Sequence, residues 1–564
     1  MKKLSILATV GAALLLSSCN DFLDEPARGE QNRDNYFSTE EECRDFVNGL
    51  YYWITCDDWW QIYNPWLQVE MCTDNAWMGN TTQDGDYRTL VEYMPNGQEN
   101  GPSSNFYQYR YKAILNCNIA IEALSDEDIV MSPSTRANLM AQARFLRGYY
   151  YFELAKLYGG LVLMDHLYTA GEAEGVGRST LDQTYEFIAE DFRYAIRNLP
   201  QKSELAAADM GRATRGAALG LHGKALVYRG KWKQASDTLG LIVREGEYDL
   251  CPSFGDNFDP TKKNGIESLM EVQHLYDAAY NIGCALSTIA GPRDVADQDG
   301  WAWGIPTAYL EKQFLDAGDT ERLRWTIIKT GCTEIAGEDQ FNKFIENNTT
   351  KDSYQGGVTN SEFQDCKKLF GWTDDYMTTR YLIKPSQHKS ARIIRKYFVP
   401  LSQRPEVYDI CKIPLNHRIL RFADVLLMYA EACQATGDEG NARTALNHVR
   451  TRVNLPDVTS GGNALLDAIR LERRLELAFE QCRLYDIRRW KGDSGKSVMA
   501  ELFGPDGSFV KYNTGADADM YEKNNQGEPS DKGTRFSESR DLLWPIPQYE
   551  IQHSNGAIEQ NPGF

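Results

Sequence analysis

The side chains best suited to chemistry are aromatic rings placed among polar residues in two loop-like segments. One is segment 73–80, Thr-Asp-Asn-Ala-Trp-Met-Gly-Asn, and the other is segment 293–303. A sugar ring offers an apolar face, which an indole or phenol covers, and a rim of hydroxyls, which Asn, Asp and Arg bind. The candidate ligand-binding residues are therefore Asp74, Trp77, Asn80, Tyr280, Arg293, Asp299, Trp301 and Trp303.

A single aromatic ring stacked on a sugar is a weak contact. Burial of about 80 Å² of apolar area contributes about 2 kcal/mol before the costs of binding are subtracted. Useful affinity therefore needs two or three aromatic rings that converge on one ligand. The competing interpretation is that these tryptophans anchor the loops to the body of the protein. Trp372, followed by Thr-Asp-Asp, is a further candidate of the same kind.

The sequence carries none of the motifs that mark common catalytic sites. It has no Gly-x-Ser-x-Gly elbow and no His-Glu-x-x-His zinc motif, and Trp490 stands where the stretch Ser494–Ser497 would need a Gly to form a phosphate loop. Asp297 and Asp299 resemble part of a calcium loop, but apolar residues occupy its first and last ligand positions. We predict no catalytic residue, no cofactor and no metal site; calcium bound elsewhere in the loops is left open.

Composition and charge exclude several classes of protein. The chain has 564 residues and a formal net charge of −20, and 42% of its residues are hydrophobic. An acidic chain of this kind does not wrap nucleic acid or lie on anionic lipid through a basic patch. The hydrophobic fraction also excludes a polytopic membrane protein and a wholly disordered chain, so a large globular body is expected.

The first residues are typical of a targeting segment. Two lysines precede an apolar run from Leu4 to Leu16, which is too short to span a bilayer, and Leu-Ser-Ser-Cys follows. This stretch resembles the lipobox of bacterial lipoproteins, with Cys19 as the lipidated residue. The acidic residues that come directly after Cys19 resemble a surface-export signal of Bacteroidetes-type lipoproteins. An ordinary secretory signal and a simple acidic tether are the alternatives.

Helices are expected to position the candidate site. Apolar residues recur at three-to-four-residue steps in segments 139–157, 181–199, 213–229 and 232–244, and again in 418–435, 439–453 and 464–490. Two glycines, Gly230 and Gly437, each lie five residues from an Ala on both sides, which predicts tight turns between closely packed helices. These turns resemble tetratricopeptide hairpins, although the full repeat consensus is absent.

The middle of the chain differs from the two helical regions. Gly, Pro, Asn and Asp are frequent there and helical runs are short, which predicts long loops with a few strands or short helices. The expected organisation is a lipoprotein signal peptide at 1–18, an acidic tether at 19–40, an N-terminal helical region at 41–249, a loop-rich region at 250–410 and a C-terminal helical region with a tail at 411–564.

Several segments together resemble the SusD/RagB family of outer-membrane nutrient-binding lipoproteins. They are, in order along the chain, CNDFLD at 19–24, FLRGY at 145–149, LRFADVLLMYAEA at 420–432, ERRLELAFE at 472–480, DIRRW at 486–490, LWPIPQYEI at 543–551 and QNPGF at 560–564. Each segment alone is a weak signal, and the ordered set is a strong one. The chain departs from the family pattern at Gln481, where many relatives carry Gly.

The resemblance implies a mostly α-helical SusD-like fold, with tetratricopeptide-like helix pairs as scaffold and a long-loop ligand-binding region. It also implies a lipid-anchored protein that lies at the outer membrane and faces the cell exterior, and whose partner is a SusC-like TonB-dependent transporter. Its function would be to capture an oligo- or polysaccharide and deliver it to that transporter without catalysis. The alternative is a RagB-like protein that takes up peptides, and a hydrolase is a third class. From the residues themselves, the Arg- and Glu-rich segment 472–480 is expected to form an internal ion-pair network, and the C-terminal segment to dock on the body.

Overall fold

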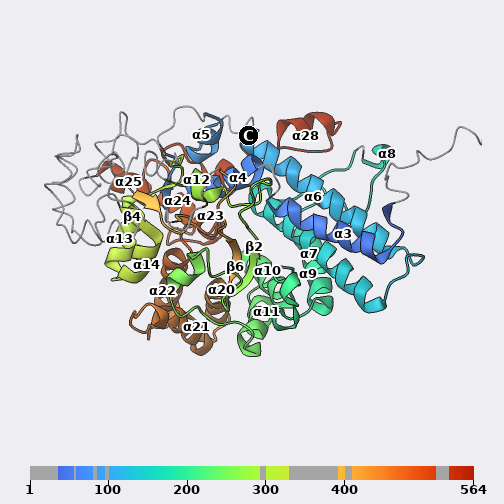
Figure 1. Cartoon of the computed structure of the whole chain (residues 1–564). Coiled ribbons are helices and arrows are strands. Elements are labelled where there is room, and N and C mark those ends of the chain that lie inside the picture. The colour runs from blue at the N-terminus through green and yellow to red at the C-terminus, as the bar shows by residue number, and fades with distance from the viewer. Residues whose placement is uncertain are drawn as a thin grey trace, which may run out of the picture.

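The computed structural model describes residues 36–55, 59–79, 85–95, 101–173, 175–291, 300–329, 392–399, 405, 410–515 and 532–564. Within these ranges helices predominate and strands are short and few, which confirms the predicted fold class (Figure 1). Several residues named above lie outside the described residues: Cys19, Asn80, Arg293, Asp299 and Trp372.

A succession of antiparallel helices forms one half of the body (Figure 1). Each helix packs on the next, because its apolar stripe is buried only against a neighbour. Hydroxyl side chains that accept a backbone N–H cap four of these helices at their N-termini: Thr39, Ser132, Thr180 and Thr214. The helices are α3 (Glu40–Leu50), α6 (Gly101–Ser125), α7 (Pro133–Tyr158), α9 (Leu181–Asn198), α10 (Arg215–Tyr228) and α11 (Trp232–Glu245).

The two predicted helix hairpins are present. α10 and α11 join at Gly230, which has a φ of +64°, and α20 (Phe422–Ala435) joins α21 (Glu439–Arg452) at Gly437, with a φ of +83°. The alanines five residues from each glycine are buried, so the paired helices approach closely. α11 also packs on α20, which connects the N-terminal and C-terminal helix pairs.

Two of the expected helices differ from the sequence prediction. The first residues of segment 418–435 belong to strand β6 (His417–Arg421), because they pair with β2 (Ser268–Val272), a partner that local periodicity does not reveal. Segment 464–490 is two helices, α22 (Gly462–Glu476) and α23 (Arg483–Arg489). The break contains Phe479 and Gln481, whose φ values are +66° and +53°.

The described residues form three two-stranded antiparallel pairs, of which two join the loop-rich middle of the chain to its two ends and the third lies within the middle. β1 (Ala76–Trp77) pairs with β3 (Ile305–Pro306), β2 pairs with β6, and β4 (Ile327–Lys329) pairs with β5 (Arg392–Ile394).

The other elements are η1 (Tyr51–Ile54), α4 (Trp59–Met71), α5 (Gly85–Val91), α8 (Ala170–Ala173), η3 (Lys202–Glu204), η4 (Ala207–Asp209), η5 (Phe254–Phe258), α12 (Leu286–Ile289), α13 (Ala308–Asp316), α14 (Thr320–Thr326), α24 (Val498–Leu502), α25 (Ser508–Thr514), α27 (Glu538–Asp541) and α28 (Gln548–His553).

The Arg- and Glu-rich segment forms the predicted internal ion-pair network. Glu476 is fully buried and its carboxylate contacts the guanidinium groups of Arg322, Arg421 and Arg452. Burial alone would raise the pKa of the Glu476 carboxyl, but Arg452, Arg421 and Arg322 hold it well below its usual range. Removal of one partner from such a network leaves an uncompensated buried charge. The network therefore favours the one arrangement in which the segments that carry these four side chains are packed together.

The C-terminal segment docks on the body, as predicted. The backbone N–H of Trp544 donates to the carbonyl of Leu157 at 2.7 Å, and the Trp544 side chain is 2% exposed. Asn561 donates from its amide to the carbonyls of Tyr158 and Trp544, and it accepts from the guanidinium of Arg178. These bonds fix the chain end beside the C-terminus of α7.

Candidate ligand-binding site

The structure brings together the two loop segments that the sequence analysis singled out. The β1–β3 pair places segment 73–80 beside the residues that follow 300, and the backbone N–H of Gly304 donates to the carbonyl of Met78 at 3.2 Å. Gly79 has a φ of +120°, and a Cβ on it would lie 2.4 Å from the carbonyl oxygen of Ala302. Only glycine allows so close an approach of the two backbones.

Asp74 is a structural residue, which corrects its assignment to ligand contact. It is fully buried, and its carboxylate forms ion pairs with Arg483 at 2.9 Å and with Arg474 at 2.8 Å. Burial would raise the pKa of Asp74, but these two guanidinium groups lower it to about 2. The carboxylate is therefore engaged with the helical body and holds the loop in place.

Trp77 and Trp303 are also buried, so their assignment to ligand contact is wrong for this conformation. Trp77 is 1% exposed, and its ring centroid lies 5.7 Å from that of Phe509. Trp303 is 2% exposed and packs edge-on against Tyr87, with centroids 4.7 Å apart. Neither indole leaves a ring face open to a sugar; both anchor the loops, as the competing interpretation expected.

Trp301 remains partly exposed where the two loops converge. Its backbone N–H donates to the carbonyl of Thr288 at 2.9 Å, and its ring meets that of Trp303 at 63°, with centroids 5.7 Å apart. The buried Trp303 therefore fixes the position of the partly exposed Trp301.

Tyr280 lies in a second exposed loop, segment 275–282. Its side chain is 69% exposed, and Leu275, Tyr276 and Ile282 are also exposed. A hydrogen bond fixes the backbone of this loop: Lys412 donates from Nζ to the carbonyl of Tyr280 at 2.9 Å. An apolar and aromatic loop with a fixed backbone loses little conformational freedom when a ligand binds it.

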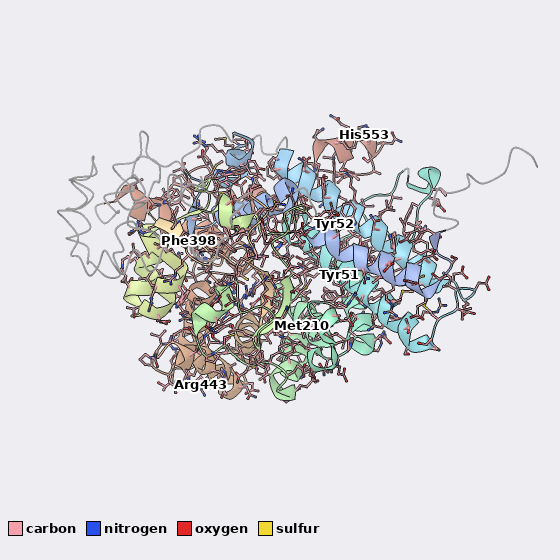
Figure 2. All side chains as sticks on the ribbon, viewed as in Figure 1. Tyr51, Tyr52, Met210, Phe398, Arg443 and His553 are labelled. Atoms are coloured by element: carbon pink, nitrogen blue, oxygen red, sulfur yellow. The ribbon has the colours of Figure 1, made fainter. Side chains whose placement is uncertain are left out.

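A cavity of about 240 Å³ adjoins this loop. Tyr51 and Tyr52 contribute to its wall, together with Asn281 and Ile282 from the loop. The Tyr52 side chain is 47% exposed, and Figure 2 shows Tyr51 and Tyr52 close together on the face turned to the viewer. Sequence reasoning missed both tyrosines, because segment 50–55 lies next to an amphipathic helix and reads as its continuation.

Buried polar groups position the floor of this cavity. The Tyr63 hydroxyl and Nε2 of His274 are hydrogen-bonded at 2.7 Å, and Nδ1 of His274 lies 3.0 Å from the carbonyl of Ile282. Burial lowers the pKa of His274 to about 4, so its imidazole is neutral near pH 7. Tyr51 donates from its hydroxyl to Gln142 at 2.9 Å, which holds its ring in the wall.

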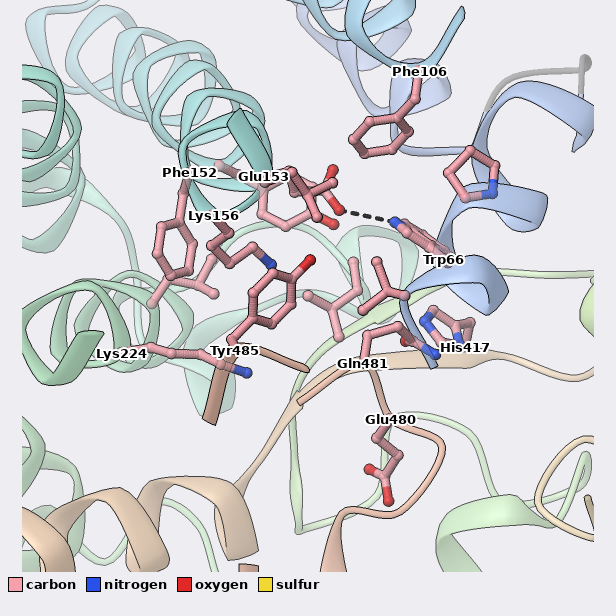
Figure 3. A pocket seen from close by; sticks show the side chains of 16 residues that line it. Trp66, Phe106, Phe152, Glu153, Lys156, Lys224, His417, Glu480, Gln481 and Tyr485 are labelled. Atoms are coloured by element: carbon pink, nitrogen blue, oxygen red, sulfur yellow. Dashed lines mark hydrogen bonds between the residues drawn. The ribbon is translucent and has the colours of Figure 1, made fainter. Parts of the chain in front are cut away.

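A smaller cavity of about 40 Å³ lies inside the helical body (Figure 3). Trp66 donates from Nε1 to Glu153 at 2.9 Å and stacks on His417 with ring centroids 4.7 Å apart. Burial lowers the pKa of Lys156 to about 8. A space of this size accommodates a few water molecules and no sugar ring, so it is part of the scaffold.

The described residues contain no group of three His, Cys, Asp or Glu side chains arranged to hold a metal ion. Among the helices that the structure describes, none is both long and apolar enough to cross a membrane.

Comparison with known proteins decides the family. Residues 267–564 match the family model described as the SusD family. The chain belongs to the SusD family. Residues 21–228 also match a model described as starch-binding and associating with the outer membrane.

Several relatives of this SusD-family chain match it over almost its whole length. "SusD-like protein P2" of Formosa agariphila is 24% identical over 100% of both chains, and a "SusD-like protein" of Bacteroides ovatus is 24% identical over 97% of this chain and 96% of its own. A SusD homolog from Bacteroides thetaiotaomicron has a TM-score of 0.74 at 20% identity, covering 95% of this chain and 99% of its own. A "Laminarin binding SusD-like protein" has a TM-score of 0.69 at 21% identity, covering 93% and 100%. These structures establish the SusD-like fold.

Proposed function

We propose that this SusD-family chain is a non-catalytic glycan-binding lipoprotein that captures oligo- or polysaccharide at the cell surface. The observation that carries the proposal is a set of exposed aromatic side chains: Tyr52 lines the 240 Å³ cavity, and Tyr276 and Tyr280 belong to the loop whose end contributes to the same wall. Phenol rings of this kind stack on the apolar faces of sugar rings, and Asn281 in the cavity wall supplies an amide for the hydroxyls.

Two further observations support a glycan as the ligand. Trp301 offers a partly buried indole at the junction of the two loops that the sequence singled out. A structural neighbour is named as laminarin-binding, and another is a "Surface glycan-binding protein A" of Bacteroides thetaiotaomicron in complex with laminarihexaose. We extend the binding site to Asn80, Arg293 and Asp299, which adjoin the described ends of the same loops.

The remaining parts of the proposal concern anchoring and delivery. We infer that residues 1–18 are removed, that Cys19 carries the lipid, and that the acidic stretch to residue 40 is the tether between the membrane and α3. The partner is a SusC-like TonB-dependent transporter in the outer membrane, to which the helical scaffold docks. Affinity purification of the lipidated chain from its native outer membrane is expected to recover a TonB-dependent transporter, and its consistent absence would contradict the partnership.

Affinity electrophoresis in gels with immobilised laminarin and other neutral polysaccharides tests ligand capture. We expect at least one polysaccharide to retard the protein, and Tyr280→Ala and Trp301→Ala each to weaken that retardation about tenfold or more, since each removes one stacking ring. The control is Leu241→Ala, which shortens a comparably apolar side chain, 37% exposed, on α11. Retardation that both aromatic variants retain would overturn the site, and hydrolysis of the polysaccharide would overturn the non-catalytic role. Co-purified peptides with no glycan bound would favour the peptide alternative.

A further inference from the structure

A second and larger groove, of about 640 Å³, lies between α6 and α28. It shares no lining residue with the cavity beside Tyr52, and Figure 1 shows α28 beside α6 at the upper edge of the molecule. Its walls come from α6, from segment 162–176 and from the C-terminal segment 549–558. The C-terminal docking described above therefore creates a groove that neither segment forms alone.

Aromatic rings line both sides of this groove. On α6, the rings of Tyr107 and Tyr111 have centroids 4.7 Å apart, and the Tyr111 hydroxyl donates to the carbonyl of Val162 at 2.9 Å, which fixes its orientation. On α28, Tyr549 stacks on His553 with centroids 3.9 Å apart, and the Tyr549 side chain is 56% exposed. Figure 2 shows His553 at the outer edge of the molecule.

Glu550 adds a carboxyl group to the aromatic walls. The residue is half-buried, and no side chain in the described part of the chain forms a hydrogen bond or an ion pair with its carboxyl. Burial raises the pKa of Glu550, while His553 lowers it. Glu550 lines the same groove as Tyr107 and Tyr111, so its carboxyl and the aromatic wall face one space.

The cationic side chains near the groove have other contacts. Lys112 holds its ammonium group over the ring of Tyr109, 4.8 Å from the centroid. Arg178 donates to the carbonyls of Gly160, Tyr158 and Glu559. Neither of these two described residues forms an ion pair with Glu550, so the carboxyl is available to a cation that enters the groove.

We propose that this groove is a second ligand site, specific for an organic cation: a protonated amine or a quaternary ammonium group. A carboxylate attracts such a group more strongly in a partly desolvated groove than in bulk water, because the effective dielectric constant is lower. The electron-rich faces of tyrosine rings attract the cation further. The carboxylate of Glu550 contacts the cation, Tyr549 and Tyr111 flank it, and the buried Tyr107 supports the Tyr111 ring from behind. The inference does not rest on glycan capture at the other face.

Calorimetric titration with cations and their neutral counterparts tests the site. The probes are choline with its uncharged analogue 3,3-dimethylbutanol, and the disaccharide of glucosamine with its N-acetylated form. We expect at least one cation to bind and its neutral counterpart to bind at least tenfold more weakly. A preference for choline identifies a quaternary ammonium ligand, and a preference for glucosamine identifies an amino sugar.

Variants at the groove separate a built site from surface attraction. Glu550→Gln, which keeps the shape and removes the charge, is expected to weaken cation binding at least tenfold, and Tyr549→Ala about threefold or more. The control is Gln552→Ala, an exposed residue on the same helix that does not line the groove. Unchanged thermal unfolding confirms that each variant is folded. Absence of binding by both cations, equal affinity for the neutral probes, or full affinity of Glu550→Gln would overturn the proposal, and none of these results bears on retardation by neutral polysaccharides.

Discussion

Asp74 and Arg483 form a two-point ion pair between segments far apart in the sequence: Nε lies 2.9 Å from Oδ1, and a terminal nitrogen lies 3.0 Å from Oδ2. The pair joins the loop that leads into β1 to the first residue of α23. Because β1 in turn pairs with β3, this buried contact sets the position of the loop that carries Trp301. The candidate site therefore depends on a charge that no ligand touches.

Replacement of Asp74 by Asn is expected to destabilise the fold by about 3 to 5 kcal/mol, since it leaves two buried guanidinium groups without their counter-charge. Burial already lowers the pKa of Arg474 to about 10, so the loss of this partner is costly. Chemical denaturation monitored by circular dichroism measures the change. The control is Asp237→Asn, which breaks an exposed pair with Lys233 and is expected to change stability by about 0.5 kcal/mol or less. Equal stability of the two variants would contradict the structural role of Asp74.

The same carboxylate predicts a loss of stability in acid. The pKa of Asp74 is about 2 in the folded state and 3.8 in its unperturbed state. Asp424, which is paired with Lys224 and Arg473, has its pKa lowered from 3.8 to about 2 in the same way. A depressed folded-state pKa contributes stability that is complete above the unfolded value and is lost as pH falls toward the folded value. Each carboxyl should therefore contribute about 2 kcal/mol above pH 4 that disappears between about pH 4 and pH 2.

Denaturation curves collected across this pH range check the prediction. The slope of unfolding free energy against pH below 4 is expected to be smaller in Asp74→Asn than in the unaltered chain, because one titrating group is missing. A slope that the substitution leaves unchanged would show that Asp74 has its ordinary pKa.

The helices, their hairpin turns and the internal ion-pair network could be predicted because their signals are local. Apolar periodicity marks α7, α9 and α11, and Gly230 marks the turn between α10 and α11. The strand β6 could not be predicted, since its five residues read as the start of a helix until the distant β2 is known. Short strands are specified by their partners more than by their own residues.

The two loop segments that form the candidate site could be singled out from the sequence, but the burial of their aromatic rings could not. An indole among polar residues has the same local signature whether it binds a ligand or anchors a loop, and the anchors Trp77 and Trp303 are distinguished only by distant neighbours such as Phe509 and Tyr87. Tyr52 escaped notice for the converse reason, because it lines a cavity whose other walls come from the distant segments 270–274 and 281–283. Sequence therefore indicates which chemistry is available, and packing decides which rings remain exposed.

Gln481 adopts a left-handed backbone conformation that usually favours glycine, and substitutions there can measure its cost. Its φ of +53° disfavours a side chain, yet its amide donates to the Tyr397 hydroxyl at 3.0 Å. Gln481→Ala loses the hydrogen bonds and keeps the strain, so we expect it to be destabilised by about 1 kcal/mol or more. Gln481→Gly loses the same bonds and relieves the strain, so it is expected to be about 1 kcal/mol more stable than the Ala variant. Thermal unfolding of the three chains measures both differences, and an Ala variant as stable as the Gly variant would contradict the strain.

Gly79→Ala is expected to separate the two loops of the candidate site. Its Cβ would lie 2.4 Å from the Ala302 carbonyl oxygen at a φ of +120°, so the β1–β3 pair must open or the backbone must move. We expect a loss of about 2 kcal/mol or more in unfolding free energy and weaker polysaccharide retardation, because Trp301 is displaced. Gly49→Ala is the matched control: Gly49 lies inside α3 with open space around its Cβ position, and alanine there should stabilise the helix by up to about 1 kcal/mol. Retained stability and retardation in Gly79→Ala would mean that the close approach of the two loops is not required for binding.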